Sequence, residues 1–305
     1  MTSILRAGVI GAGVFGGYHA AKYAELADVE LAAVFDPHPE RARALADRFG
    51  GRAFADLAGF LAAVDVVSIA APAAAHAGHA LAALRAGKPV YVEKPLATSP
   101  ADADAIIAEA RKQGLTVACG FLERAAFAAM GLFDIPQAPT RLEATRLGPA
   151  SPRSLDVSVV LDLMIHDLDL ALALTRAEPL AVEAEGACVD NALFDQVEAE
   201  VSFDDGFTAL LRASRVARGR ERTMRLTYPS GEVTIDFLAH TFENTTPFAL
   251  DRAFEETPAG KDRLGASIAA FLAAARGGAS VPLADGRDGA RAHDLALAVE
   301  AAVGG

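Results

Sequence analysis

One stretch of the sequence carries carboxylates and an imidazole inside an otherwise apolar run. Residues 159–174 read VVLDLMIHDLDLALAL, and the apolar positions recur at the spacing of a helix. Asp162 and His166 lie four positions apart, so we predict that they share one face of this helix. A neutral imidazole held by a carboxylate can take a proton from an alcohol near neutral pH. The alternative interpretation is an amphipathic helix with a solvated acidic stripe.

A second reactive group lies at the end of a predicted strand. Lys94 follows the apolar run 89–92 and stands between Glu93 and Pro95. An ammonium group beside a substrate oxygen would stabilise developing negative charge and could return a proton in the reverse direction. Taken alone, a lysine at a strand end is usually a solvated charge. Together with the helical pair, however, Lys94 supplies chemistry for oxidising an alcohol to a ketone, a reaction that also needs a hydride acceptor.

The beginning of the chain contains a pattern typical of dinucleotide binding. A short apolar run leads into Gly11, Gly13 and Gly16, which match G-x-G-x-x-G. In this pattern the first glycine permits a tight turn, the second lets the backbone approach a pyrophosphate, and the third lets the helix pack close to the strand. The apolar run 29–35 predicts a second strand that ends at Asp36, 20 residues after Gly16. A carboxylate there would accept ribose hydroxyls and repel a 2′-phosphate, which favours NAD over NADP.

The remaining patterns predict two domains. Strand-like and helical segments alternate up to position 120, so we predict a Rossmann domain with a doubly wound parallel sheet in residues 1–120. For residues 121–305 we predict an α+β domain with a large, mainly antiparallel open sheet. Its expected strands are 140–147, 196–203, 207–214, 223–228 and 232–238. Helices are expected at 264–276 and 288–302, and the last helix could pack back on the first domain.

Composition restricts the partners and the compartment. A chain of 305 residues that is 52% hydrophobic can form two cores. The net charge of −12 argues against a nucleic-acid partner, because phosphate binding needs a basic surface. The apolar stretches are too short to span a bilayer and a signal-peptide pattern is missing, so we expect a cytoplasmic protein. We expect Cys119 and Cys188 to be buried free thiols, and we predict no metal site.

Three motifs together resemble the glucose-fructose oxidoreductase and inositol dehydrogenase (Gfo/Idh/MocA) family. They are the glycine turn, the Glu93-Lys94-Pro95 triplet, and the pattern D-x-x-x-H-D that begins at Asp162. The resemblance extends over nearly the whole chain. It implies a dehydrogenase that uses NAD or NADP and acts on sugars or cyclitols. It also implies a homodimer or homotetramer that forms through the open face of the second-domain sheet.

The resemblance also implies roles for individual residues. Lys94, Asp162 and His166 would be catalytic and would contact the substrate. Pro72 and His76 would lie at the nicotinamide end of the cofactor. The full set predicted to contact or frame the cofactor is Gly11, Ala12, Gly13, Val14, Phe15, Gly16, Asp36, Ala71, Pro72, His76, Glu93, Lys94 and Pro95.

Within this family the chain is similar to the UDP-N-acetylglucosamine 3-dehydrogenase branch. The similarity lies in GFLERAAF at 120–127 and in LDLMIHDLD, although Ala125, Ala126 and Phe127 replace the aromatic-Asn-Pro sequence of that branch. We therefore predict oxidation of the 3-hydroxyl of a UDP-amino sugar to a 3-ketone, with Arg124 as a cation suited to a diphosphate. The alternatives are a free-sugar or cyclitol dehydrogenase, an elimination or glycoside-cleaving enzyme that regenerates its NAD, and a non-catalytic dinucleotide sensor.

Overall fold

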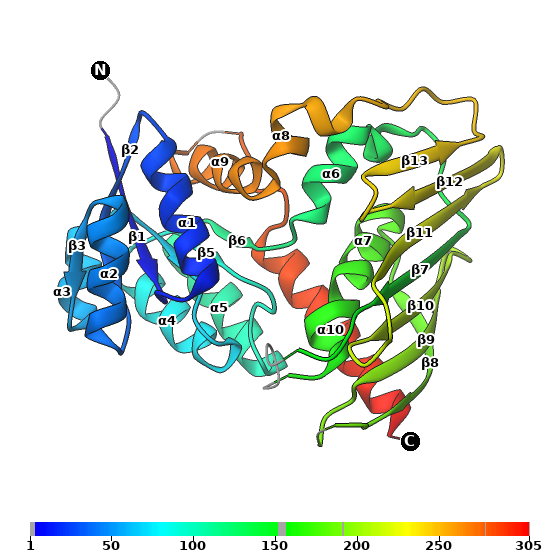
Figure 1. The fold of residues 1–305 in the computed structure, drawn as a ribbon, viewed down its shortest axis with the longest axis horizontal. Helices are drawn as coiled ribbons and strands as arrows, with labels where there is room; N and C mark the ends of the chain where they lie inside the picture. Colours follow the sequence, from blue (N-terminus) through cyan, green and yellow to red (C-terminus); the bar gives the residue numbers. More distant parts are fainter. Residues whose placement is uncertain (1–3, 152–156, 191, 278, 305) are drawn as a thin grey trace. The chain divides into compact units, whose positions relative to one another are not determined.

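The structure, a computed structural model, describes residues 4–151, 157–190, 192–277 and 279–304. The chain forms two compact units (Figure 1). The first unit comprises Met1–Leu122 and Asp262–Ala290, and the second comprises Glu123–Lys261 and Arg291–Gly305. The segment Asp262–Ala290 thus belongs with the first unit, although the sequence analysis assigned it to the second domain.

A six-stranded parallel sheet forms the centre of the first unit, in the order β3-β2-β1-β4-β5-β6. Its strands are β1 (Leu5–Ile10), β2 (Val29–Phe35), β3 (Arg52–Phe54), β4 (Val66–Ile69), β5 (Val90–Val92) and β6 (Val117–Cys119). This strand order, with β1 and β4 at the point where the direction of winding reverses, is that of a Rossmann fold. The predicted doubly wound sheet is confirmed. The edge strand β3 was not predicted, because three residues carry too little periodicity.

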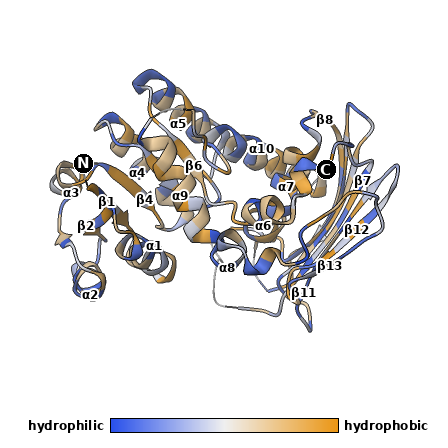
Figure 2. Cartoon of the chain, turned by 90° about the horizontal axis from the view of Figure 1, so that it is seen from above, coloured by the Kyte–Doolittle hydropathy of each residue, from blue (hydrophilic) through white to orange (hydrophobic). Residues whose placement is uncertain are grey.

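Five helices connect these strands or the segments between them: α1 (Val14–Glu25), α2 (Pro39–Phe49), α3 (Leu57–Ala63), α4 (Ala73–Arg85) and α5 (Pro100–Gln113). A further helix of this unit, α9 (Arg263–Ala275), comes from the later segment. Strands of a parallel sheet that is covered on both faces are apolar along their whole length. Figure 2 shows this pattern in β1 and β4, whereas α2 carries hydrophilic stretches.

Helix α9 explains why the later segment belongs to the first unit. Ile268, Phe271 and Leu272 of α9 lie in the same hydrophobic core as Val9 of β1. The ring of Phe271 lies 5.8 Å from the ring of Tyr91, edge to face. The Tyr91 hydroxyl lies 3.0 Å from the Ser267 hydroxyl. The apolar face of α9 is therefore buried against strands that precede it by more than 170 residues.

A seven-stranded sheet forms the second unit, in the order β13-β12-β11-β7-β10-β9-β8. Its strands are β7 (Arg141–Leu147), β8 (Pro179–Ala187), β9 (Gln196–Phe203), β10 (Thr208–Ser214), β11 (Glu221–Tyr228), β12 (Gly231–Asp236) and β13 (Thr241–Asn244). The pair β10 and β7 is parallel and the other pairs are antiparallel, which confirms the predicted sheet. Strands β8 and β13 were not predicted. They form the two edges, where the alternation of buried and exposed residues is weak or short.

Helices of the second unit lie on one side of this sheet (Figure 1). They are α6 (Glu123–Met130), α7 (Ile165–Thr175) and α8 (Pro258–Lys261), while α10 (Gly286–Val303) begins in the first unit and ends in the second. Short 3-10 turns occupy Leu132–Asp134 and Phe254–Glu256. In the described part of the chain, every helix is too short or too polar to cross a bilayer.

Two local expectations are corrected. The stretch 159–174 is not one α-helix, because Val160–Met164 forms a π-helical turn before α7 begins. The hydroxyl oxygen of Ser158 accepts hydrogen bonds from the amides of Val160 and Leu161 at the start of this turn. Both cysteines are free thiols, but Cys188 is exposed, because it lies just beyond the end of β8.

Candidate active site

The glycine turn between β1 and α1 contains two glycines that the fold itself requires. Gly11 has a φ of 95°, and a Cβ there would lie 2.5 Å from the carbonyl oxygen of Ala70. A Cβ on Gly16 would lie 1.7 Å from the carbonyl oxygen of Gly11. No side chain fits at either distance, so both positions need glycine for the turn and for close packing of α1.

Gly13 has a different constraint. A Cβ at this position would meet no atom within 4 Å among the described residues. Gly13 directly precedes the first turn of α1, where the amide groups of a helix N-terminus attract an anion. The open backbone at Gly13 therefore fits the pyrophosphate of a dinucleotide. Val14 and Phe15, the next two residues, have exposed side chains.

Asp36 is held against the glycine turn by backbone hydrogen bonds. Its Oδ2 accepts one from the amide of Ala12 at 2.8 Å, and its Oδ1 accepts one from the amide of His38 at 2.8 Å. A carboxylate oxygen can accept more than one hydrogen bond, so Asp36 can bind a ribose hydroxyl while it stays anchored. Its negative charge would repel the 2′-phosphate that NADP carries on this ribose.

The two kinds of glycine lead to a paired prediction. Gly13→Ala is expected to weaken NAD binding by about tenfold or more without lowering the thermal unfolding temperature, because its methyl group meets the pyrophosphate and no protein atom. Gly16→Ala is the comparison, and it should lower the unfolding temperature by several degrees, because its methyl group overlaps the backbone of Gly11. Titration calorimetry and thermal unfolding check both. A Gly13→Ala variant with unchanged affinity for NAD would contradict the assignment.

Lys94 lies on a turn whose neighbours on both sides are anchored. Nε2 of His19 lies 2.9 Å from Oε1 of Glu93, and Nδ1 of His76 lies 2.7 Å from the carbonyl oxygen of Pro95. The Lys94–Pro95 peptide bond is cis. Lys94 is half-buried and His19 is fully buried. His19 could not be identified from the sequence, because its partner lies 74 residues away.

His76 ties this turn to the end of β4. Its Nε2 lies 2.9 Å from the carbonyl oxygen of Ala71, and the side chain is almost fully buried. Pro72 precedes the first turn of α4, the helix that carries His76. The structure thus brings Ala71, Pro72, His76 and Pro95 together in the first unit. Their predicted contacts with the nicotinamide end of the cofactor remain a prediction.

In the second unit, His166 lies beside a carboxylate that the sequence analysis missed. Its Nδ1 is 3.1 Å from Oε2 of Glu123, the first residue of α6. Asp162 lies in the π-helical turn that precedes α7, and such turns are frequent at functional sites. Asp162 and His166 are both partly buried, and Asp169 is 1% exposed. The alternative of a solvated acidic stripe is therefore wrong.

Glu123 in turn belongs to a buried network of charges. Arg146 of β7 donates to Oε1 of Glu123 at 3.0 Å and to both carboxylate oxygens of Asp167 at 2.8 and 3.0 Å. Burial alone would raise the pKa of Glu123, but the adjacent His166 and Arg146 together hold that pKa well below its ordinary value. The carboxylate facing His166 is therefore ionised at neutral pH.

Arg124 has a carboxylate partner in its own unit. Its Nε and Nη2 donate to the two oxygens of Asp169 at 2.8 and 2.7 Å, and both side chains are buried. Such a bidentate pair is among the strongest side-chain contacts in proteins. It fixes α6 to α7, the two helices that also carry Glu123 and His166. The predicted contact of Arg124 with a diphosphate remains a prediction.

The lowered pKa of Glu123 predicts how stability depends on pH. A carboxylate whose pKa is lower in the folded than in the unfolded protein contributes stability above the unfolded value, here 4.5, and loses it as the pH falls through the folded value. The free energy of unfolding of the wild-type protein should therefore decrease below about pH 4.5, and less steeply in Glu123→Gln. Urea unfolding between pH 3 and pH 7 measures both slopes. Equal slopes would contradict the ion-pair network.

The glycine turn, Asp36 and the strand order all indicate dinucleotide binding. Residues 5–121 match the oxidoreductase family with an NAD-binding Rossmann fold, and residues 141–234 match the GFO/IDH/MocA C-terminal domain. The chain is therefore an NAD-dependent oxidoreductase. The chain belongs to the Gfo/Idh/MocA family, as its motifs predicted.

Several known proteins resemble the chain. The UDP-N-acetylglucosamine 3-dehydrogenase of Acidithiobacillus ferrooxidans is 39% identical over 98% of this chain and 97% of its own length. A solved structure of UDP-N-acetylglucosamine 3-dehydrogenase GnnA from that organism has a TM-score of 0.91 at 40% identity and covers 99% of this chain and 98% of its own. An inositol 2-dehydrogenase of Acidothermus cellulolyticus is 32% identical over 59% of this chain and 56% of its own length.

Proposed function

We propose that the chain oxidises the 3-hydroxyl of a UDP-amino sugar to a ketone. The observation that carries this proposal is the 39% identity to a UDP-N-acetylglucosamine 3-dehydrogenase over 98% of the chain. The similarity includes both units, and therefore the parts that would bind the sugar as well as the parts that bind the cofactor. NAD supplies the acceptor for the hydride when it is bound.

In this proposal His166 is the general base. A neutral imidazole takes the proton of the hydroxyl, and the ionised Glu123 beside it stabilises the imidazolium that results. Arg146 keeps Glu123 in place, which preserves the orientation of the imidazole ring during turnover. Asp162, on the turn before α7, is the second carboxylate that we assign to orienting His166 or the sugar.

Lys94 stabilises negative charge on the reacting oxygen. The anchored turn matters, because it holds the backbone from which the lysine side chain extends. In the reverse direction the same ammonium group can donate a proton to the carbonyl oxygen. The base and the cation both act on the hydroxyl oxygen, where the proton leaves and negative charge develops.

A substrate panel tests the proposal. UDP-N-acetylglucosamine, UDP-glucose, free N-acetylglucosamine and myo-inositol would each be offered with NAD or NADP, and NADH or NADPH followed by absorbance. We expect turnover with the UDP-amino sugar and NAD, and a lower kcat/KM with NADP because of Asp36. Turnover of myo-inositol alone would establish the cyclitol alternative, which the partial similarity to inositol 2-dehydrogenase favours.

Two other outcomes separate the remaining alternatives. Product formation without net NADH would indicate elimination or glycoside cleavage, because these reactions return the cofactor to its starting state. Tight NAD binding without conversion of any sugar would indicate a sensor. Mass spectrometry of the UDP-amino sugar product, with loss of two hydrogen atoms, establishes the ketone.

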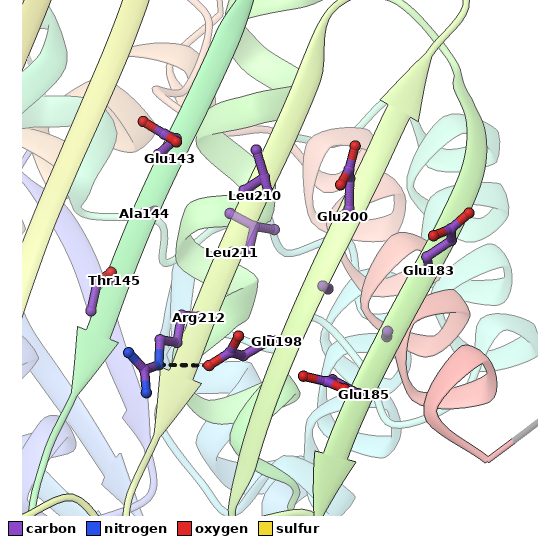
Figure 3. A pocket seen from close by; sticks show the side chains of 12 residues that line it. Glu143, Ala144, Thr145, Glu183, Glu185, Glu198, Glu200, Leu210, Leu211 and Arg212 are labelled. Atoms are coloured by element: carbon purple, nitrogen blue, oxygen red, sulfur yellow. Dashed lines mark ion pairs between the residues drawn. The ribbon is translucent and has the colours of Figure 1, made fainter.

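We also propose a cytoplasmic homodimer or homotetramer that forms through the outer face of the second-unit sheet. Figure 3 shows Glu183, Glu185, Glu198 and Glu200 on β8 and β9, with Arg212 of β10 paired to Glu198 at 2.8 Å. Exposed arginines lie on the strands beyond β10, at Arg141 and Arg225, but both pair with Glu143 of β7. The excess of carboxylates is on β8 and β9, so a charge reversal on these two strands would disturb an interface on this face most strongly.

Sedimentation velocity tests this interface. The wild type should sediment as a dimer or tetramer, and the reversal of two acidic residues, Glu183→Arg with Glu200→Arg, should shift it toward the monomer. A wild type that sediments as a monomer at micromolar concentration would exclude the interface.

A further inference from the structure

A chain of hydrogen bonds in the first unit leads from the helix after the glycine turn to the turn that carries Lys94. His19 of α1 is its centre. Nε2 of His19 lies 2.9 Å from Oε1 of Glu93, and Nδ1 lies 2.9 Å from the hydroxyl of Ser68. The Ser68 hydroxyl lies 2.7 Å from the hydroxyl of Tyr23, one helical turn after His19. His19, Ser68 and Tyr23 are each 0% exposed.

The chemistry of the partners fixes the direction of one of these bonds. A carboxylate oxygen accepts, so Nε2 of His19 donates to Oε1 of Glu93. Nδ1 and the Ser68 hydroxyl share one hydrogen, and the Ser68 and Tyr23 hydroxyls share another. Both ring nitrogens of His19 and both hydroxyl groups therefore have a hydrogen-bond partner.

Glu93 has little freedom to move away from His19. Its amide donates to the carbonyl oxygen of Ile69 at 2.9 Å, which continues the sheet to the residue just before Lys94. A Cβ on Gly120 would lie 2.7 Å from Oε2 of Glu93, so the carboxylate packs directly over this glycine. The ring of Tyr91 covers the ring of His19 at 5.1 Å, edge to face. The carboxylate is thus enclosed between α1 and the residue that follows β6.

We propose that His19 is a positioning residue for Lys94, a proposal that rests on the catalytic role of Lys94 proposed above. The helix whose N-terminus fits the pyrophosphate would thereby also fix the lysine, through Glu93. The glycine turn and the backbone at Lys94 would then be linked within one compact unit. Loss of the bond to Glu93 leaves that carboxylate without its buried partner and lets the following residue move.

Two substitutions test the hydrogen bonds of the two ring nitrogens of His19 one at a time. In His19→Gln the amide nitrogen can replace Nε2 and still donate to Glu93, whereas in His19→Asn the amide can replace Nδ1 and bond to Ser68 but cannot reach Glu93. Both variants remove the ring from the core, so both should lower the unfolding temperature, and His19→Asn should lower it more because it leaves the Glu93 carboxylate without its buried partner. Each therefore serves as the control of the other for packing.

A positioning role predicts different kinetics for the two variants. His19→Gln should keep kcat within about threefold of the wild type, and His19→Asn should lose about 10- to 100-fold, as expected when a reacting group is displaced by about 1 Å. The Kd of NAD should change little in both. A His19 that only fills the core would give equal kcat values in the two variants, and that result would overturn the proposal.

NMR spectroscopy can observe Lys94 directly, without a measurement of turnover. The sequence has five lysines: Lys22, Lys88, Lys94, Lys112 and Lys261. After selective 13C labelling of their ε-carbons, single substitutions assign each NMR signal, and the chemical shift of Lys94 is the quantity measured. The Lys94 signal should shift in His19→Asn and stay near its wild-type position in His19→Gln. Gly120→Ala perturbs Glu93 from the other side and should shift the same signal. An unmoved Lys94 signal in both His19→Asn and Gly120→Ala would overturn the proposal.

Failure of this proposal can be told from failure of the proposed function. If Lys94→Ala abolishes turnover but the two His19 variants turn over equally, Lys94 is catalytic and His19 does not position it. If Lys94→Ala keeps full turnover while the Lys94 signal shifts in His19→Asn alone, His19 positions the lysine and the proposed mechanism is wrong.

Discussion

Replacing Lys94 by alanine is expected to lower kcat by about two to four orders of magnitude while the Kd of NAD changes little. The ammonium group would contact the reacting oxygen and would be needed most when negative charge develops there, so its loss acts mainly on the transition state. The residues that anchor its turn, Glu93 and Pro95, are unchanged in this variant, so the backbone should keep its conformation. Steady-state kinetics with the UDP-amino sugar and calorimetric titration with NAD measure the two effects.

Lys112 offers a matched control in the same unit. Its ammonium group is exposed and pairs at 3.6 Å with Glu109 on α5, outside both the glycine turn and the turn that carries Lys94. Lys112→Ala should leave kcat and the Kd of NAD within experimental error of the wild type. Near-normal turnover in Lys94→Ala would remove this residue from the mechanism and leave His166 as the sole assigned group that handles protons.

Replacing His166 by alanine is expected to lower kcat by about two to four orders of magnitude, the usual contribution of a general base. The residue lies on the first turn of α7 with part of its side chain exposed, so the fold should tolerate a smaller side chain. In the wild type, oxidation should slow at acid pH, because an imidazolium cannot accept the proton of the alcohol. The His166→Ala variant should lose this dependence on pH together with most of its turnover.

Two further variants decide which carboxylate supports His166. Glu123→Gln removes the charge that lies 3.1 Å from the imidazole, and Asp162→Asn removes the one on the preceding π-helical turn. A larger shift of the acid side of the pH profile in Glu123→Gln would assign the supporting role to Glu123. His240→Asn, at an exposed histidine of the same unit, is the control and should have a wild-type profile. An unchanged profile in His166→Ala would make His166 a structural residue.

The parts of the fold that depend on local pattern could be predicted from the sequence. Apolar runs predicted the long strands of both sheets, and the spacing of three glycines and Asp36 predicted the dinucleotide site. Both kinds of feature depend on residues that are close in the sequence. Strand β8 was missed because, at the edge of its sheet, most of its side chains are exposed and its apolar pattern is weak. The π-helical turn was missed because the same residues suit an α-helix.

The parts of the site that depend on distant pairs could not be predicted. His19 reads as an ordinary polar residue of an amphipathic helix until the fold places Glu93 beside it. Glu123 stood in a stretch that the sequence analysis singled out, yet nothing local indicated that it would face His166 rather than solvent. Similarly, the charge of Arg124 suggested a ligand, whereas its contact with Asp169 follows from the packing of two helices.

The return of the chain to the first unit has a consequence for synthesis on the ribosome. Domains commonly fold from the N-terminus as they emerge, but the core of this Rossmann unit includes Ile268, Phe271 and Leu272. Translation must therefore pass through the whole of the seven-stranded sheet before the nucleotide-binding core can close. Until α9 has been synthesised, the apolar surface around Tyr91 stays uncovered. The nascent chain would therefore bind chaperones that protect exposed hydrophobic segments.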